Sequence, residues 1–203
     1  MHYFCLSRST QFFSKEEQGT ADCLLAFFEK QGIKAYRQGN NVYTISNQFS
    51  NHAPTILLNS HHDTVRPNAQ YTRNPFLPTV EEGRLYGLGS NDAGGSLVSL
   101  VAAFCELQAT ASEYGWNLVL AATAEEEISG SGGIEALLHD QQFINNTQGC
   151  FLPAQLHPHT AAVVGEPTLL QMAVAERGLM VLDVYATGKA GHAAREEGEN
   201  AIY

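Results

Sequence analysis

The chain has 203 residues, of which 44% are hydrophobic and 16% charged, an ordinary composition for a folded protein with a buried core. With 21 Asp and Glu against 11 Lys and Arg it carries a formal net charge of -10, which argues against a nucleic-acid partner because phosphate binding needs a basic face. Its longest apolar stretches are too short to span a membrane, and residues 1–13 lack the long apolar run of a signal peptide.

The first 46 residues predict a helix followed by a hairpin. Ser14, followed three residues later by Glu17, is a capping-box pattern, so we expect Ser14 to be the N-cap of a helix that runs to about Gly32. Residues 33–37 and 41–46 flank a turn at Gly39-Asn40-Asn41 and read as the two strands of a hairpin. The helix is supported by apolar residues at helical spacing: Ala21, Leu24, Leu25 and Phe28.

Three short apolar runs follow, and each ends in a histidine or in acidic residues. Residues 55–60, 117–123 and 161–165 are the runs. They end in His61-His62-Asp63, Glu125-Glu126-Glu127 and Glu166-Pro167, respectively. We predict helices between the runs, from Gly95 to about Ala109 and from Gly133 to about Asp140.

Buried strands that alternate with helices indicate an α/β fold, with a mostly parallel sheet flanked by helices. Ligands of such sheets bind at the carboxyl ends of the strands, which is where the histidines and acids stand. From residue 176 the pattern changes to one alternating strand and the start of a helix. We therefore expect a metal-binding catalytic domain over residues 1–175 and the beginning of a second, α+β domain over residues 176–203.

His61 and Asp63 are candidates for a metal ligand and its partner. Alternate residues of a strand share a face, and a metal-bound imidazole needs an acceptor for its second nitrogen. The alternative is a pair of polar residues in a surface turn. Asp92 lies in a glycine-rich loop, LYGLGSNDAGG, where an acid can approach a cation closely. The alternative for Asp92 is the N-cap of the next helix.

Glu125, Glu126 and Glu127 are three adjacent carboxylates after a buried strand. Their mutual repulsion would be relieved if one carboxylate bound a cation and a neighbour held a proton. A solvated acidic loop is the alternative. Glu166 precedes Pro167, which fixes the turn and holds the carboxylate near the tip of its strand. The four places together predict a metal site at one edge of the sheet.

The segments SHHDTV, LYGLGSNDAGG, ATAEEEISGSGG, VVGEPT and GKAGHAAREEGENAI resemble, in order, motifs of the M20 metallopeptidase family. The likeness is greatest to its acetylornithine deacetylase and succinyl-diaminopimelate desuccinylase group, and it extends from about Ser14 to Tyr203. It implies a zinc-peptidase-like fold whose second domain is a lid and dimerisation domain. It also implies that the Asp92–Ala93 peptide bond is cis.

The resemblance also implies a role for each residue. His61, Asp92 and Glu166 would bind one Zn²⁺, and Asp92 would bridge to a second that Glu127 binds. Asp63 would orient His61, and Glu126 would be the general base. His192, in GKAGHAA, matches a lid histidine that steadies the oxyanion, reaching the active site of the partner subunit in dimeric members.

The implied activity is hydrolysis of the amide bond of an N-acyl amino acid, with N-acetylornithine as the first candidate substrate, in arginine biosynthesis. Co²⁺ is a possible substitute for Zn²⁺. We expect a homodimer in the full-length form, with no membrane or nucleic-acid partner. Four cysteines without a CxxC pair suggest free thiols and a cytoplasmic location.

Two alternatives stay open, a di- or tripeptidase of the same family and a metal-binding module without catalytic activity. The family pattern ends in a further histidine, a ligand of the second Zn²⁺, which has no counterpart before Tyr203. We therefore expect the 203-residue chain alone to hold about one zinc and to be inactive. A nucleotide site in the glycine-rich segment is disfavoured because GxGxxG spacing is lacking.

Overall fold

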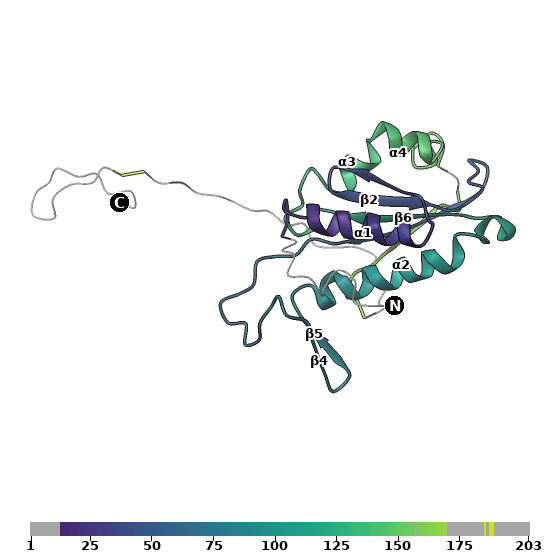
Figure 1. Ribbon diagram of the computed structural model, residues 1–203. Coiled ribbons are helices and arrows are strands. Elements are labelled where there is room, and N and C mark those ends of the chain that lie inside the picture. The colour runs from purple at the N-terminus through teal and green to yellow at the C-terminus, as the bar shows by residue number, and fades with distance from the viewer. Residues whose placement is uncertain (1–12, 157, 170–184, 186, 189–203) are drawn as a thin grey trace, which may run out of the picture. The chain divides into compact units, whose positions relative to one another are not determined.

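The computed structural model of the chain describes residues 13–156, 158–169, 185 and 187–188. Its centre is a five-stranded sheet of order β1-β2-β6-β3-β7 (Figure 1). Strands β6, β3 and β7 are parallel, whereas β1 and β2 form a hairpin that joins the edge of β6 antiparallel. The predicted α/β fold and hairpin are confirmed. The strands are β1 (Ala35–Gln38), β2 (Asn41–Ile45), β3 (Thr55–His61), β6 (Asn117–Thr123) and β7 (Ala161–Val164).

Helices cover both faces of this sheet (Figure 1). On one face α1 (Gln18–Lys30) and α2 (Ser96–Leu107) pack against Leu118, Leu120 and Ala122 of β6. On the other, α3 (Ile134–Leu138) and α4 (Gln141–Asn146) pack against Val119 and Ala121. Successive side chains of a strand point to opposite faces, so a strand that is apolar throughout needs a helical layer on each side.

The predicted capping box is wrong. Helix α1 begins at Gln18, with Glu17 as a N-cap residue that makes no capping side-chain bond. The Ser14 hydroxyl donates instead to Asp63 Oδ2 at 2.6 Å, and the carboxylate of Glu17 turns inward and is fully buried. Both side chains thus form hydrogen bonds with residues far away in the sequence, Asp63 and Glu125, in place of the local capping bonds.

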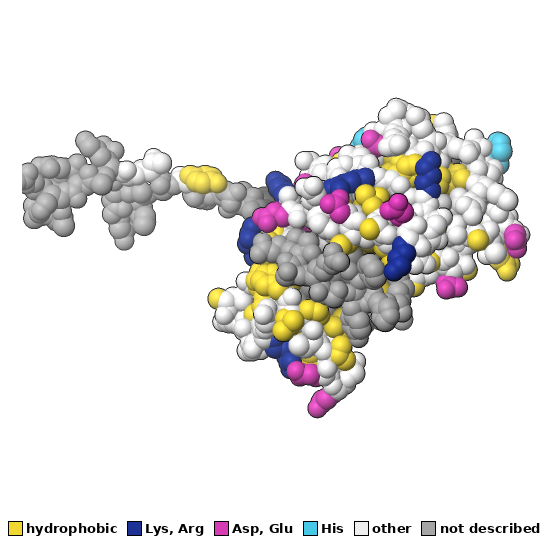
Figure 2. All heavy atoms as spheres, in the orientation of Figure 1, with side chains coloured by type: hydrophobic (Ala, Val, Ile, Leu, Met, Phe, Trp, Pro, Cys, Tyr) yellow, Lys and Arg dark blue, Asp and Glu magenta, His cyan; other side chains and the backbone are white. Residues whose placement is uncertain are grey.

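Two further elements were not predicted. The helix expected up to about Asp140 ends at Leu138, and Asp140 is the N-cap of α4, accepting the Phe143 N–H at 2.8 Å. A two-stranded hairpin, β4 (Thr79–Glu81) and β5 (Arg84–Tyr86), lies outside the main sheet (Figure 1). Apolar side chains are visible at the surface around this hairpin (Figure 2), and the exposed ones in this part of the chain include Phe76, Leu77 and Val80.

By its contacts the chain divides into residues Met1–Leu169 and Leu170–Tyr203. The second domain expected over residues 176–203 lies outside the described residues, except for positions 185, 187 and 188. The division into residues 1–175 and 176–203 therefore stays a prediction. None of the helices in the described part of the chain is long and apolar enough to cross a membrane.

Candidate metal centre

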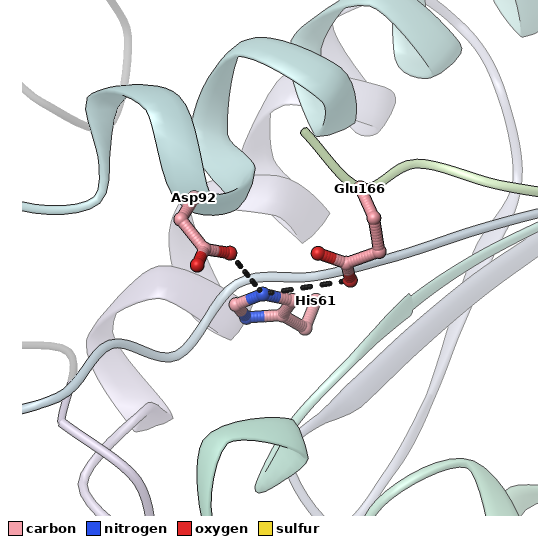
Figure 3. A group of neighbouring side chains, drawn as sticks. All are labelled: His61, Asp92 and Glu166. Carbon is pink, nitrogen blue, oxygen red and sulfur yellow. Dashed lines mark hydrogen bonds and ion pairs between the residues drawn. The ribbon is translucent and has the colours of Figure 1, made fainter. Parts of the chain in front are cut away.

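Three side chains from different parts of the sequence meet at the carboxyl edge of the sheet (Figure 3). His61 ends β3, Asp92 lies in the turn before α2, and Glu166 follows β7. His61 Nε2 lies 3.1 Å from Asp92 Oδ1 and 3.7 Å from Glu166 Oε1. The ligand atoms of the three residues all lie within 4.8 Å of one another. One imidazole nitrogen and two carboxylates form a donor set that fits Zn²⁺ and similar divalent cations.

Asp63 contacts the imidazole of His61 at Nδ1, the nitrogen that does not face Asp92 and Glu166. The two side chains are fully buried, with His61 Nδ1 3.3 Å from Asp63 Oδ1 and 3.0 Å from the Asp63 carbonyl oxygen. Burial excludes the alternative of a surface turn. Between them, His62 turns the other way and contacts Thr20 Oγ1 at 2.7 Å and the Asn40 carbonyl at 3.0 Å. The expected alternation along the strand therefore places His61 Nε2, and not His62, toward the acids.

The acids around His61 change its proton affinity. Burial by itself lowers the pKa of His61, but hydrogen bonds with Asp63 and Asp92 and the charges of Asp63 and Glu166 outweigh it and raise the pKa to about 9. Burial and neighbouring carboxylates raise the pKa of Glu127 and of Glu166. At neutral pH His61 is therefore protonated, and a cation that binds to Nε2 has to displace this proton.

Metal binding should consequently strengthen as the pH rises. Because the cation must displace a proton from His61, we expect the apparent affinity for Co²⁺ or Zn²⁺ to rise about tenfold per pH unit between about pH 7 and the pKa of about 9, and then to level off. Competition with a chromophoric chelator across this pH range measures the slope. An affinity that does not change over the range would contradict the assignment of His61 as a ligand.

Asp92 does not cap the following helix. Helix α2 begins at Ser96 with Gly95 as the N-cap residue, and Asp92 lies in the preceding Ser90–Gly95 turn with φ -113° and ψ 101°. The Asp92–Ala93 peptide bond is cis, as the resemblance implied. The turn requires Gly94, because a Cβ atom there would lie 2.5 Å from the Gly89 carbonyl oxygen. The alternative of an N-cap aspartate is excluded.

The three adjacent glutamates differ in their surroundings. Glu126 Oε2 lies 3.7 Å from His61 Nε2, and 52% of the Glu126 side chain is exposed. Glu125 accepts the Gly132 N–H at 3.2 Å through its carboxylate, which packs against the glycines that follow the turn. Glu127 is not part of the ligand group formed by the described residues. Glu126 as base and Glu127 as second-metal ligand stay predictions.

Sequence reasoning did not find the residues that fix Glu166. Gly165 donates its N–H to the Asn59 carbonyl at 2.7 Å, and Ser60 Oγ donates to the Gly165 carbonyl at 2.8 Å. A Cβ atom at Gly165 would lie 2.9 Å from Leu100 Cδ1 and 3.0 Å from Ser60 Cβ, so only glycine fits without displacement. The available signal was a glycine directly before the acid at a strand end. His192, the predicted lid histidine, lies outside the described residues.

The amino-acid sequence is similar to those of known proteins. The sequence model of peptidase family M20/M25/M40 matches residues 57–190. The chain is 34% identical to acetylornithine deacetylase of Proteus mirabilis over 149 residues, covering 72% of this chain and 34% of that protein. It is 25% identical to succinyl-diaminopimelate desuccinylase of Wolbachia pipientis over 205 residues, covering 96% of this chain and 49% of that protein.

Solved structures agree in fold. An M20 family metallo-carboxypeptidase from Sulfolobus solfataricus superimposes with a TM-score of 0.54 at 25% identity, over 77% of this chain and 35% of that one. Human carnosine dipeptidase 1 gives a TM-score of 0.53 at 15% identity, over 77% and 36%, and shows the fold alone. The chain spans about a third to a half of the length of the curated relatives named above. It belongs to peptidase family M20/M25/M40.

Proposed function

We propose that the chain carries the metal-binding part of an amidohydrolase that converts an N-acyl amino acid into a free amino acid and a carboxylate. The observation that supports this most is the meeting of His61, Asp92 and Glu166 with the carboxylate of Glu126 beside them. N-acetylornithine, in arginine biosynthesis, is the first candidate substrate because a similar protein is an acetylornithine deacetylase. A related N-acetyl or N-succinyl amino acid is the next candidate.

The residues divide the chemistry among them. His61, Asp92 and Glu166 would hold a Zn²⁺ or Co²⁺ ion, which supplies a Lewis acid that polarises an amide carbonyl and acidifies water. Glu126 would take the proton of the attacking water and return it to the leaving amine, and its exposure lets substrate and water reach it. Asp63 keeps His61 Nδ1 occupied, so that Nε2 faces the site.

Other parts of the proposal rest on the resemblance. Glu127 and Asp92 would contribute to a second metal site, and His192 would donate a hydrogen bond to the oxyanion from the lid of a homodimer. We place the enzyme in the cytoplasm, in keeping with the free thiols of Cys23, Cys105 and Cys150.

A peptidase is the second candidate function, favoured by the likeness to a metallo-carboxypeptidase at 25% identity. Both candidate activities hydrolyse an amide bond, and their substrates differ in the acyl group on the nitrogen. An acetyl or succinyl group distinguishes the first substrate class, and an aminoacyl group the second. A metal-binding role without catalysis is the third, and the position of Glu126 beside the ligand group speaks for a catalyst instead.

The test is a substrate comparison on the metal-loaded protein, including any residues that the gene encodes after Tyr203. We expect amine release from N-acetylornithine or an N-succinyl amino acid to exceed release from dipeptides. The 203-residue chain assayed in parallel should retain about one metal ion after dialysis, held by His61, Asp92 and Glu166, and should show negligible turnover. Absence of amine release from every N-acyl amino acid would overturn the proposed function, and preferential cleavage of dipeptides would select the peptidase.

A further inference from the structure

The backbone of the acidic turn is bound by buried side chains. Four successive N–H groups, those of residues 124–127, each donate to a side-chain oxygen. The acceptors are, in order, Asn41 Oδ1, Glu17 Oε1 and the two carboxylate oxygens of Asp63, at 2.9, 3.2, 3.1 and 3.3 Å. All three acceptor residues are at most 1% exposed. The turn that carries Glu126 is thus fixed from inside the protein.

Glu17 makes this contact from the N-cap position of α1. Its Oε1 atom also accepts the Lys15 N–H at 2.7 Å, and its Oε2 atom accepts Asn40 Nδ2 at 2.8 Å. A buried carboxylate is costly unless its oxygens accept hydrogen bonds, and here three donors surround it. The arrangement ties the acidic turn to the start of α1 and to the hairpin between β1 and β2.

Asn41 forms hydrogen bonds to both ends of the loop formed by residues 124–133. While its Oδ1 accepts the N–H of Ala124, its Nδ2 donates to the carbonyl oxygens of Gly132 and Gly133 at 2.7 and 3.2 Å. The loop between these ends carries the three glutamates.

The conformation of the turn needs such external support. Glu125 has φ 54° and Ser129 φ 48°, in the left-handed region that residues with side chains rarely adopt. The hydrogen bond to Glu17 supports this conformation at Glu125, the residue that directly precedes Glu126, and the bond to Asn41 holds the adjacent Ala124. Without them, the turn can relax and carry the Glu126 carboxylate away from His61 Nε2, now 3.7 Å distant.

We propose that Glu17 and Asn41 are positioning residues, which fix the backbone of residues 124–127 and thereby the place of Glu126 in the site. The inference rests on the proposed function, since it assigns the two residues to the base of that reaction. Neither residue touches the ligand group itself, so their effect should appear in the turn and in turnover, and not in the first metal site.

Amide hydrogen exchange of the 203-residue chain tests the contact independently of activity. In Asn41→Ala we expect exchange in residues 124–133 to accelerate about tenfold or more relative to the protected amides of β6, because a lost buried hydrogen bond shifts a local opening equilibrium by about that factor. Glu17→Gln, which keeps the size of the side chain and removes one acceptor, guards against a variant that does not fold. It should give a smaller acceleration in the same segment.

Asn117 provides a matched control at the opposite end of β6. It is also buried, its Oδ1 accepts the Ser50 N–H at 3.0 Å, and its Nδ2 donates to the Ser50 and Ala53 carbonyls at 2.7 and 3.2 Å. Asn117→Ala should therefore cost a similar part of the global stability but accelerate exchange around residues 50–55. Equal acceleration of the acidic turn by Asn41→Ala and Asn117→Ala would reduce Asn41 to a structural role and overturn the proposal.

Turnover gives the second measurement. In the active protein, Asn41→Ala should lower kcat about tenfold or more and Glu17→Gln by a smaller factor, both at nearly unchanged KM and metal content, because displacement of a base by about 1 Å slows catalysis. Asn117→Ala should leave kcat per folded molecule unchanged. A selective loosening of the turn with unchanged kcat would overturn the positioning role. Absence of turnover in the unsubstituted protein would instead refute the proposed function, and hydrogen exchange would still decide whether the contact fixes the turn.

Discussion

Glu126→Gln is expected to lower turnover of the N-acyl amino acid by about 10²–10⁴, the usual contribution of a general base. The amide keeps the shape of the side chain and removes its ability to accept the proton of water. The metal content should not change, because Glu126 lies outside the ligand group of His61, Asp92 and Glu166. Steady-state kinetics together with metal analysis after dialysis measure both effects.

Glu127→Gln is the matched comparison, since it makes the same chemical change at the adjacent residue. It should weaken the binding of a second metal ion and spare the first. If instead Glu126→Gln lost metal, and Glu127→Gln retained its metal but turned over slowly, the roles of the two residues would have to be exchanged.

Asp63→Ala is expected to lower the free energy of unfolding by about 3–5 kcal/mol, the effect of removing one partner from a buried charged pair. The carboxylate is fully buried, and its loss leaves His61 Nδ1, the Ser14 hydroxyl and the amides of Glu126 and Glu127 without this acceptor. Affinity for the metal should fall about 10–100-fold, because His61 loses the residue that orients it. Urea denaturation and metal competition measure the two losses.

Ser14→Ala is the control for this prediction, because it removes only the hydroxyl that donates to Asp63 Oδ2 and should cost about 1 kcal/mol. If the two variants were equally stable, the Asp63 carboxylate would contribute no more than its hydrogen bond with Ser14, which would contradict the prediction.

The Asp63 effect should also depend on pH. Burial raises the pKa of Asp63, but hydrogen bonds from His61, Ser14 and the Glu126 amide outweigh it and hold the pKa below its usual value. Its stabilising contribution is therefore complete above the pKa of the unfolded chain, about 4, and is lost as the pH falls toward the folded value. The difference in unfolding free energy between the native protein and Asp63→Ala should shrink below about pH 4. A difference that grew on acidification would contradict the assignment.

The position of the candidate site could be predicted because three apolar runs each end in polar residues. Runs 55–60, 117–123 and 161–165 are strands β3, β6 and β7 in the structure. Strand β6 is buried along its whole length and β3 along most of it, which leaves an uninterrupted apolar signature, whereas the four residues of β7 are exposed in the described part of the chain. All three strands are parallel, so their carboxyl ends lie at one edge of the sheet. The parallel pairing of β3 and β7 thus brings His61 and Glu166 to the same edge of the sheet.

Helix boundaries were harder to predict where tertiary contacts compete with local ones. Ser14 and Glu17 have the spacing of a capping box, yet Ser14 bonds to Asp63, 49 residues away, and Glu17 bonds to the amide of Glu125, 108 residues away. A capping bond contributes about 1 kcal/mol, so another favourable hydrogen bond for the same side chain can displace it.

By itself, then, the sequence determined the α/β class, the main strands and the edge at which the site forms, because periodicity and strand ends are local properties of the chain. The tertiary structure alone decided that the β1–β2 hairpin joins β6 antiparallel. It also decided that Asn41 and Glu17 hold the acidic turn. These are single hydrogen bonds and pairings between residues far apart in the chain, and such contacts leave no repeating pattern in the sequence from which they could be predicted.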